Sequence, residues 1–211
     1  MTAATPAKIA VPEHLMRLPR QGSSPDDRLP PMTPAQMTPE QKAAAEQFEK
    51  ERGMPIGGPF VPLSRSPEVL KMATHIGKYL RTQSPVPTKL SELATLITAR
   101  RWSQNFEWYA HEGIARHAGL AESVIKAIAE GRHPEAMGDD EAAVYAFCTE
   151  THRNGNVCDA TYAKAKALLG EQGVIDLVAI CGYYTLLAFA MNVARTPLPE
   201  GVKPGLAAFP G

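Results

Sequence analysis

The sequence has few cysteines, and no two of them lie close together. Its 211 residues contain three, Cys148, Cys158 and Cys181. An odd number of cysteines with no CxxC spacing fits neither a disulfide framework nor a zinc ribbon. The sequence therefore indicates a reducing compartment, and we expect a cytoplasmic protein.

The sequence also lacks an excess of charge of either sign and a long hydrophobic run. Its 22 basic and 22 acidic residues cancel, so we expect neither nucleic acid nor an anionic membrane as a partner. The N-terminus has no apolar segment of the signal-peptide kind. The most apolar run, residues 177–191, would span about 22 Å as a helix, less than the roughly 30 Å of a bilayer core. It predicts a buried central helix.

Strand-like alternation of apolar and polar residues is absent, whereas proline is frequent near both ends. Residues 1–65 and 197–211 are proline-rich and predict an N-terminal arm and a C-terminal tail. Between them, residues 66–196 carry helical periodicity and predict an all-α bundle of about six to eight helices. We expect the arm to wrap its own domain or a neighbouring subunit.

Helix boundaries follow from capping signals. In the arm, Thr38 is the expected N-cap, Pro39 the first helical residue, Gln41 the capping-box partner and Gly53 the stop. The helices of the main domain are predicted to begin after Ser66, Thr88, Ser103, Asp139 and Asp159, with further helices over 121–131 and 174–195. In the first, the expected core stripe is Val69, Leu70, Ala73, Ile76 and Leu80.

The segment NFEWYAH, residues 105–111, carries an acid and an imidazole on one helix face. Glu107 and His111 are four residues apart, so their side chains are neighbours. Glu92 lies among leucines on the preceding helix, and a short link makes the two helices antiparallel. Glu92 and His111 are therefore expected at one level, where a buried carboxylate needs a partner. Such a cluster prepares a histidine for proton transfer.

These residues carry a family resemblance. The stretch SELATLITARRWSQNFEWYAHEGIARHAGL, with GPFVPLSRSPEVL before it and GYYTLLAFAMNVARTPLP after it, resembles the carboxymuconolactone decarboxylase family, which includes the alkyl hydroperoxidase D proteins. The resemblance covers about residues 60–200. It implies a compact helical bundle, a small-molecule substrate and a homo-oligomer, namely a dimer, trimer or hexamer.

The resemblance departs from the hydroperoxidase branch at the thiols. In that branch a glutamate, a Cys-x-x-Cys pair and a histidine relay protons to a redox thiol. The glutamate and histidine match Glu92 and His111, but Gln104 and Glu107 stand where the cysteines would be. A hydroperoxidase is therefore disfavoured, because it needs a thiolate and a resolving thiol. The implied activity is a decarboxylase, lyase or isomerase that acts without cofactor or metal on a small carboxylated lactone or aromatic-degradation intermediate.

The chemistry of that reaction assigns roles to the three polar residues. His111 is the expected general acid or base, Glu107 would orient its ring or exchange protons with it, and Glu92 would orient it from behind or relay protons. An alternative is that Glu107 and His111 form a structural pair at a subunit interface. A metal site is not expected, because only one histidine lies within reach.

Four further residues are candidates for substrate binding. Arg100 or Arg101 would hold a substrate carboxylate bidentately, although cations at a helix C-terminus also complement the helix dipole. Trp108 would line the pocket or pack at an interface, and Tyr184 would line the pocket or pack in the core. A non-catalytic, scaffolding homologue with a vestigial pocket is the second functional hypothesis.

Overall fold

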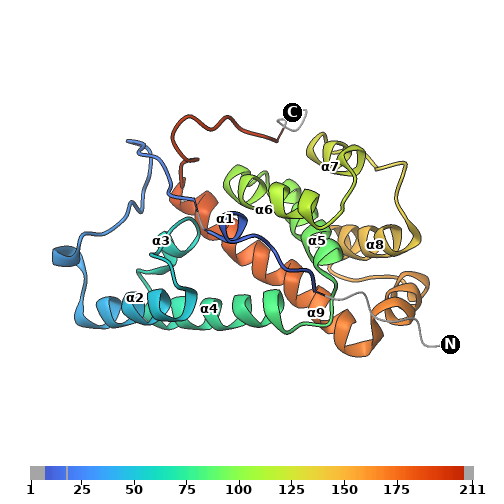
Figure 1. Ribbon diagram of the computed structural model, residues 1–211, viewed down its shortest axis with the longest axis horizontal. Helices are drawn as coiled ribbons and strands as arrows, with labels where there is room; N and C mark the ends of the chain where they lie inside the picture. Colours follow the sequence, from blue (N-terminus) through green and yellow to red (C-terminus); the bar gives the residue numbers. More distant parts are fainter. Residues whose placement is uncertain (1–7, 18, 207–211) are drawn as a thin grey trace.

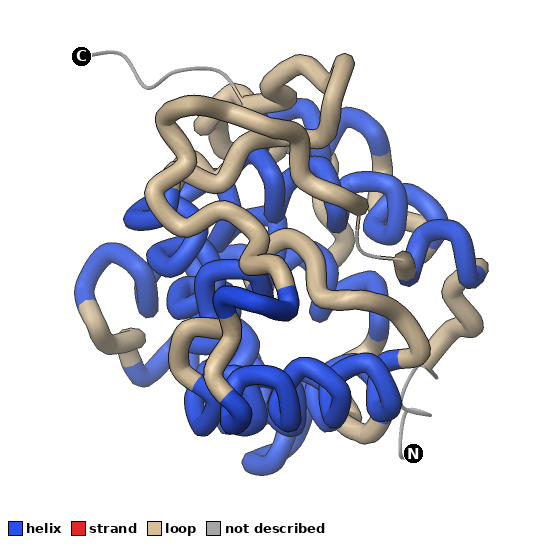
Figure 2. Tube along the Cα trace, turned by 90° about the vertical axis from the view of Figure 1, so that its left-hand side faces the viewer, coloured by secondary structure: helices blue, strands red, loops and turns tan. Residues whose placement is uncertain are grey.

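The computed structural model describes residues 8–17 and 19–206, and within them every regular element is a helix (Figure 2). The all-α prediction is confirmed. In chain order the elements are α1 (Glu13–Met16), the 3-10 turn η1 (Pro34–Gln36), α2 (Pro39–Arg52), α3 (Phe60–Leu63), α4 (Pro67–Thr82), α5 (Thr88–Arg101), α6 (Asn105–His117), α7 (Glu122–Ala129), α8 (Asp139–Asn154) and α9 (Asp159–Ala194).

Helix α9 is the axis of the molecule. It runs diagonally across Figure 1, with α2 and α4 on one side and α5, α6 and α8 on the other. As predicted, this part of the chain forms two helical segments, which meet in a kink at Gly170, where a φ of 70° and a ψ of 178° are non-helical and are tolerated by glycine. Leu177, Ile180 and Ala188 are fully buried along it, so the apolar run is a core helix, as predicted.

The capping signals were right for the arm helix and wrong for two others. The Thr38 side chain accepts from the Gln41 amide, and Gly53 ends α2 in the left-handed region. At α5 the N-cap is Pro87, one residue before the expected Thr88. At α6 the N-cap is Gln104, whose side chain accepts from the Phe106 amide, because the preceding link turns tightly.

The predicted stripe of α4 was also partly wrong. Leu70, Ala73 and Leu80 are buried, whereas Val69 and Ile76 are partly exposed. The buried face instead turns toward α2 and α9 through small residues, Thr74 and Gly77. The helical periodicity of the apolar residues did not show which of two adjoining faces of α4 is buried.

The N-terminal arm packs on its own domain. Lys8 Nζ donates to the Leu80 carbonyl at 3.0 Å, and the Ile9 amide donates to Thr88 Oγ1 at 3.2 Å. Farther along, Phe48 of α2 is buried in the common core. The tail takes part too, since Leu206 is buried there. The arm and tail are therefore layers over the helical domain.

One face of α9 is apolar and exposed. We call Ile175, Val178, Leu186, Phe189 and Val193 the α9 stripe; their side chains are between 43% and 66% exposed. The spacing of three, eight, three and four residues keeps them on one helix face. By length and composition α9 is able to cross a membrane, but 56% of its most apolar window is buried in the protein, as in a core helix.

We expect this stripe to be an interface between copies of the chain. Ile175→Glu combined with Phe189→Glu should lower the molar mass measured by light scattering to that of a monomer, because two charges would be buried at the interface. Tyr162→Glu, at an exposed position before the kink, is the control. A wild-type chain that is monomeric at micromolar concentration would contradict the expectation.

Candidate active site

His111 and Glu92 form a buried pair that joins α6 to α5. His111 Nδ1 lies 2.7 Å from Glu92 Oε2, and both side chains are nearly inaccessible to solvent. A carboxylate oxygen accepts, so Nδ1 carries the proton in this contact. The other ring nitrogen, Nε2, is left for the hollow beside it.

The local sequence of α5 explains how Glu92 comes to be buried. Almost every residue of this helix is buried, and its polar side chains satisfy themselves within the helix. Thr95 Oγ1 donates to the Ser91 carbonyl at 2.9 Å, and Thr98 Oγ1 donates to the Ala94 carbonyl at 2.8 Å. A carboxylate has no proton to donate to a helix carbonyl, and Glu92 instead accepts from the imidazole of the antiparallel neighbour.

Glu107 lies one turn before His111 and is in a different situation. Its side chain is 3% exposed, and within the described part of the chain neither carboxyl oxygen has a hydrogen-bond partner. Burial alone raises the pKa of Glu107 well above its usual 4.5. A buried carboxyl group without a partner favours its neutral, protonated form.

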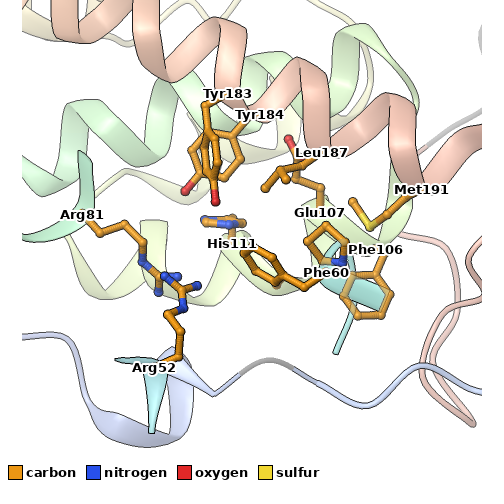
Figure 3. Close-up of a pocket in the computed structure, with 12 residues that line it drawn as sticks. Arg52, Phe60, Arg81, Phe106, Glu107, His111, Tyr183, Tyr184, Leu187 and Met191 are labelled. Carbon is orange, nitrogen blue, oxygen red and sulfur yellow. The ribbon is translucent and has the colours of Figure 1, made fainter. Parts of the chain in front are cut away.

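Glu107 and His111 open into a hollow between α2, α4, α6 and α9 (Figure 3). Its volume, measured out to the mouth, is about 370 Å³. The hollow is narrow, and only about 30 Å³ is open to the centre of a water molecule. Figure 3 shows Arg52 and Arg81 on one side of His111. The opposite side is apolar and is lined by Phe60, Phe106, Leu187 and Met191.

The cationic side holds two guanidinium groups without a carboxylate partner among the described residues. Arg52 lies over the rings of Phe48 and Phe60, at 5.8 and 5.2 Å. Its pKa is lowered by burial and by the charge of Arg81. Arg81 Nη2 donates to the sulfur of Met16, 3.1 Å away on α1. An anionic ligand would supply the charge that this side lacks.

Two tyrosines of α9 complete the wall. The Tyr184 ring meets the His111 ring edge-on, with centroids 4.9 Å apart. Burial raises the pKa of Tyr183 to about 12 and raises that of Tyr184 as well, so both phenols are neutral. The Tyr183 hydroxyl rests against Gly77, where a Cβ atom would lie 2.3 Å from its oxygen.

The predicted site residues divide into two groups. The structure brings Glu92, Glu107, His111 and Tyr184 together, and it is Glu92 that orients the imidazole. The other three are elsewhere and need correction. Trp108 packs in the core beneath Gly205, while Arg100 and Arg101, at the far end of α5, line a separate hollow.

Sequence reasoning missed Arg52 and Arg81. Both lie in the last turn of a helix, where a cation complements the helix dipole and gives no sign of a site. No cysteine lines the hollow. Cys148 and Cys181 lie in the core with their sulfur atoms 3.6 Å apart, and Cys158 is the exposed N-cap of α9. Among the described residues, no three His, Cys, Asp or Glu side chains form a metal-ligating group.

The sequence matches no known family profile and no curated protein. The fold does have a counterpart among solved structures, a cysteine-to-alanine variant of the debrominase Bmp8 in complex with 2,3,4-tribromopyrrole. The TM-score is 0.60 at 12% identity, over 85% of this chain and 94% of the other. The two chains share an alkyl hydroperoxidase D-like helical fold, and the structural neighbour is an enzyme.

The neutral state of Glu107 has a consequence for stability. Below about pH 4.5 the carboxyl is protonated in both the folded and the unfolded chain. Above that pH only the folded chain keeps the proton, so the free energy of unfolding falls as pH rises toward the folded-state pKa. Glu107→Gln removes this loss. Its melting temperature relative to wild type should be higher at about pH 8 than at about pH 5.

The same scan with Glu112→Gln, a half-buried position of α6 outside the hollow, is the control. A difference in melting temperature that is constant across this range would show that Glu107 is not a neutral acid in the folded protein.

Proposed function

We propose that this protein is a cofactor-free decarboxylase, lyase or isomerase that acts on a small carboxylated lactone or related ring-cleavage product. One observation carries the proposal: a histidine hydrogen-bonded to Glu92 shares a hollow with the buried Glu107 carboxyl group, which has no hydrogen-bond partner, and with two arginines that lack carboxylate partners among the described residues. The group contains what proton transfer on an anionic substrate requires, namely an oriented imidazole, a proton reserve and an anion-binding end.

The cationic end determines how the substrate lies. Arg52 and Arg81 hold an anionic group, bidentately where the geometry allows. They do not hold a carboxylate that leaves as CO₂, because stabilising that anion would oppose its loss of charge. They hold either a second carboxylate or the carbonyl oxygen on which negative charge develops.

The apolar end is the place for a leaving carboxylate. Next to Phe106, Leu187 and Met191 a carboxylate has lost its water and gained no cation, so departure as neutral CO₂ relieves an unfavourable charge. The electron pair of the broken carbon–carbon bond moves into the conjugated carbonyl. Nε2 of His111, which takes up one proton from water in each turnover, then delivers that proton to carbon, and Glu107 donates a hydrogen bond or passes a proton to the ring.

The hollow favours a substrate with one small ring. The space open to water centres is about 30 Å³, so entry requires the long side chains at the cationic end to move outward. The debrominase of the same fold was solved with a single substituted pyrrole ring, which supports a ligand of this size. We further propose that the protein is a cytoplasmic homo-oligomer and that neither nucleic acid nor a membrane is its partner.

A second candidate is a scaffolding homologue whose pocket is vestigial. The observation in its favour is the same narrow interior. A hydroperoxidase is not proposed, because the three cysteines lie outside the hollow.

The test is turnover of a panel of carboxylated lactones by the purified protein, followed as CO₂ release or product isomerisation by mass spectrometry. His111→Ala should lower kcat by roughly 10²–10⁴-fold, the usual contribution of general acid–base catalysis, with little change in KM. Arg81→Gln should raise KM about tenfold or more, because a charge-assisted hydrogen bond to substrate is lost.

Glu112→Gln, on the same helix as His111 but outside the hollow, serves as the control and should behave as wild type. If the panel gives no turnover, or if His111→Ala lowers only the melting temperature and leaves turnover intact, the acid–base proposal is wrong. The scaffolding candidate would then stand.

A further inference from the structure

A second hollow lies at the opposite end of α5 from Glu92. Its cavity volume is about 320 Å³, which falls in the range of small-molecule sites. It shares no lining residue with the hollow at His111. We call it the arginine hollow; four arginines line it together with His152, namely Arg100, Arg101, Arg132 and Arg153.

The charge in this hollow is of one sign. No aspartate or glutamate lines it. Arg132 is neutralised by an ion pair with Glu130, but neither Arg101 nor Arg153 forms an ion pair with a carboxylate among the described residues. The guanidinium of Arg101 lies over the Trp102 ring at 5.2 Å, which holds it near the rim.

The chain shows a close fit around Arg100, which is itself buried. A Cβ atom at Gly131, after α7, would lie 3.1 Å from Arg100 Nη2, and the φ of Gly131 is 71°. Glycine at this position lets the backbone bend sharply and approach the guanidinium closely. Charge is thus concentrated where the C-terminal ends of α5, α7 and α8 come together, and their dipoles already favour cations there.

The remaining walls indicate what kind of anion fits. Ile97 and Ile128 supply apolar surface, and Tyr145 supplies a ring with a hydroxyl group. His152 Nε2 lies 2.8 Å from Thr98 Oγ1, so its ring is held in place at the wall. A purely inorganic anion would leave the apolar walls unused.

We propose that the arginine hollow is a binding site for a small organic anion, in which Arg101 and Arg153 hold a phosphate or carboxylate group and Ile97, Ile128 and Tyr145 contact its apolar body. Guanidinium groups match both acid groups in geometry, and bidentate contacts to them are the stronger class of hydrogen bond. The site is additional to the proposed acid–base site and does not depend on it.

The experiment is calorimetric titration of the full chain with phenyl phosphate at about 0.15 M salt, since exposed charges are screened by salt. Titration with benzoate shows whether the site prefers a carboxylate or a phosphate group. Inorganic phosphate shows whether the apolar part of the ligand contributes to affinity, and phenol shows whether the negative charge does. The variant is Arg101→Gln combined with Arg153→Gln, both at exposed positions that tolerate substitution. Its Kd should rise at least tenfold, because two charge-assisted contacts are removed.

A control variant locates the binding. Arg116→Gln, exposed on α6, should leave the Kd unchanged. The proposal is overturned if phenyl phosphate and benzoate both fail to bind at millimolar concentration, if phenol binds as well as either, or if inorganic phosphate binds as tightly as phenyl phosphate. It is also overturned if Arg116→Gln weakens binding as much as the double variant.

Discussion

The contact between His111 Nδ1 and Glu92 Oε2 constrains the packing of α5 and α6. Because α5 is buried on almost every face, Glu92 is only 5% exposed, and the imidazole is its hydrogen-bond partner. The N-terminal arm closes over the same place. Lys8, whose pKa is lowered by burial and raised in part by the charge of Glu92, lines a neighbouring cavity with that carboxylate. Losing either member would leave a buried polar group unsatisfied beneath the arm.

The two glutamates near His111 show how one site can give two carboxyl groups different roles. Glu92 has an imidazole partner, whereas Glu107 has no hydrogen-bond partner among the described residues and a raised pKa. The first suits orientation of the ring and the second suits donation of a proton, a division set by environment alone. The charges of the molecule are divided as well. Arg52 and Arg81 line one hollow and Arg101 and Arg153 line another, so the neutral net charge of the chain conceals two local concentrations of positive charge.

The sequence predicted the helical class, the arm helix from Thr38 to Gly53 and the pairing of Glu92 with His111, because each rests on local spacing or on one short helical link. It did not predict that Glu107 lacks a partner, since that depends on which side chains of α9 and α3 surround it. Nor did it place Arg52 or Arg81, which are distant in sequence from the site and are brought there by the packing of α2 and α4. The predicted place of Trp108 was wrong because Gly205, which lies far away in the tail of the sequence, packs against its ring.

The central claim is that Glu107 is a neutral acid beside an oriented histidine, and its protonation state can be observed directly. Carbon-13 NMR of protein labelled at the glutamate side-chain carboxyl carbons would follow each carboxyl group through a pH titration, with Glu107→Gln identifying the resonance of Glu107. The account predicts that this resonance keeps the chemical shift of a protonated acid at pH 7, after the exposed glutamates have titrated. A Glu107 resonance that titrates together with the exposed glutamates would contradict the account.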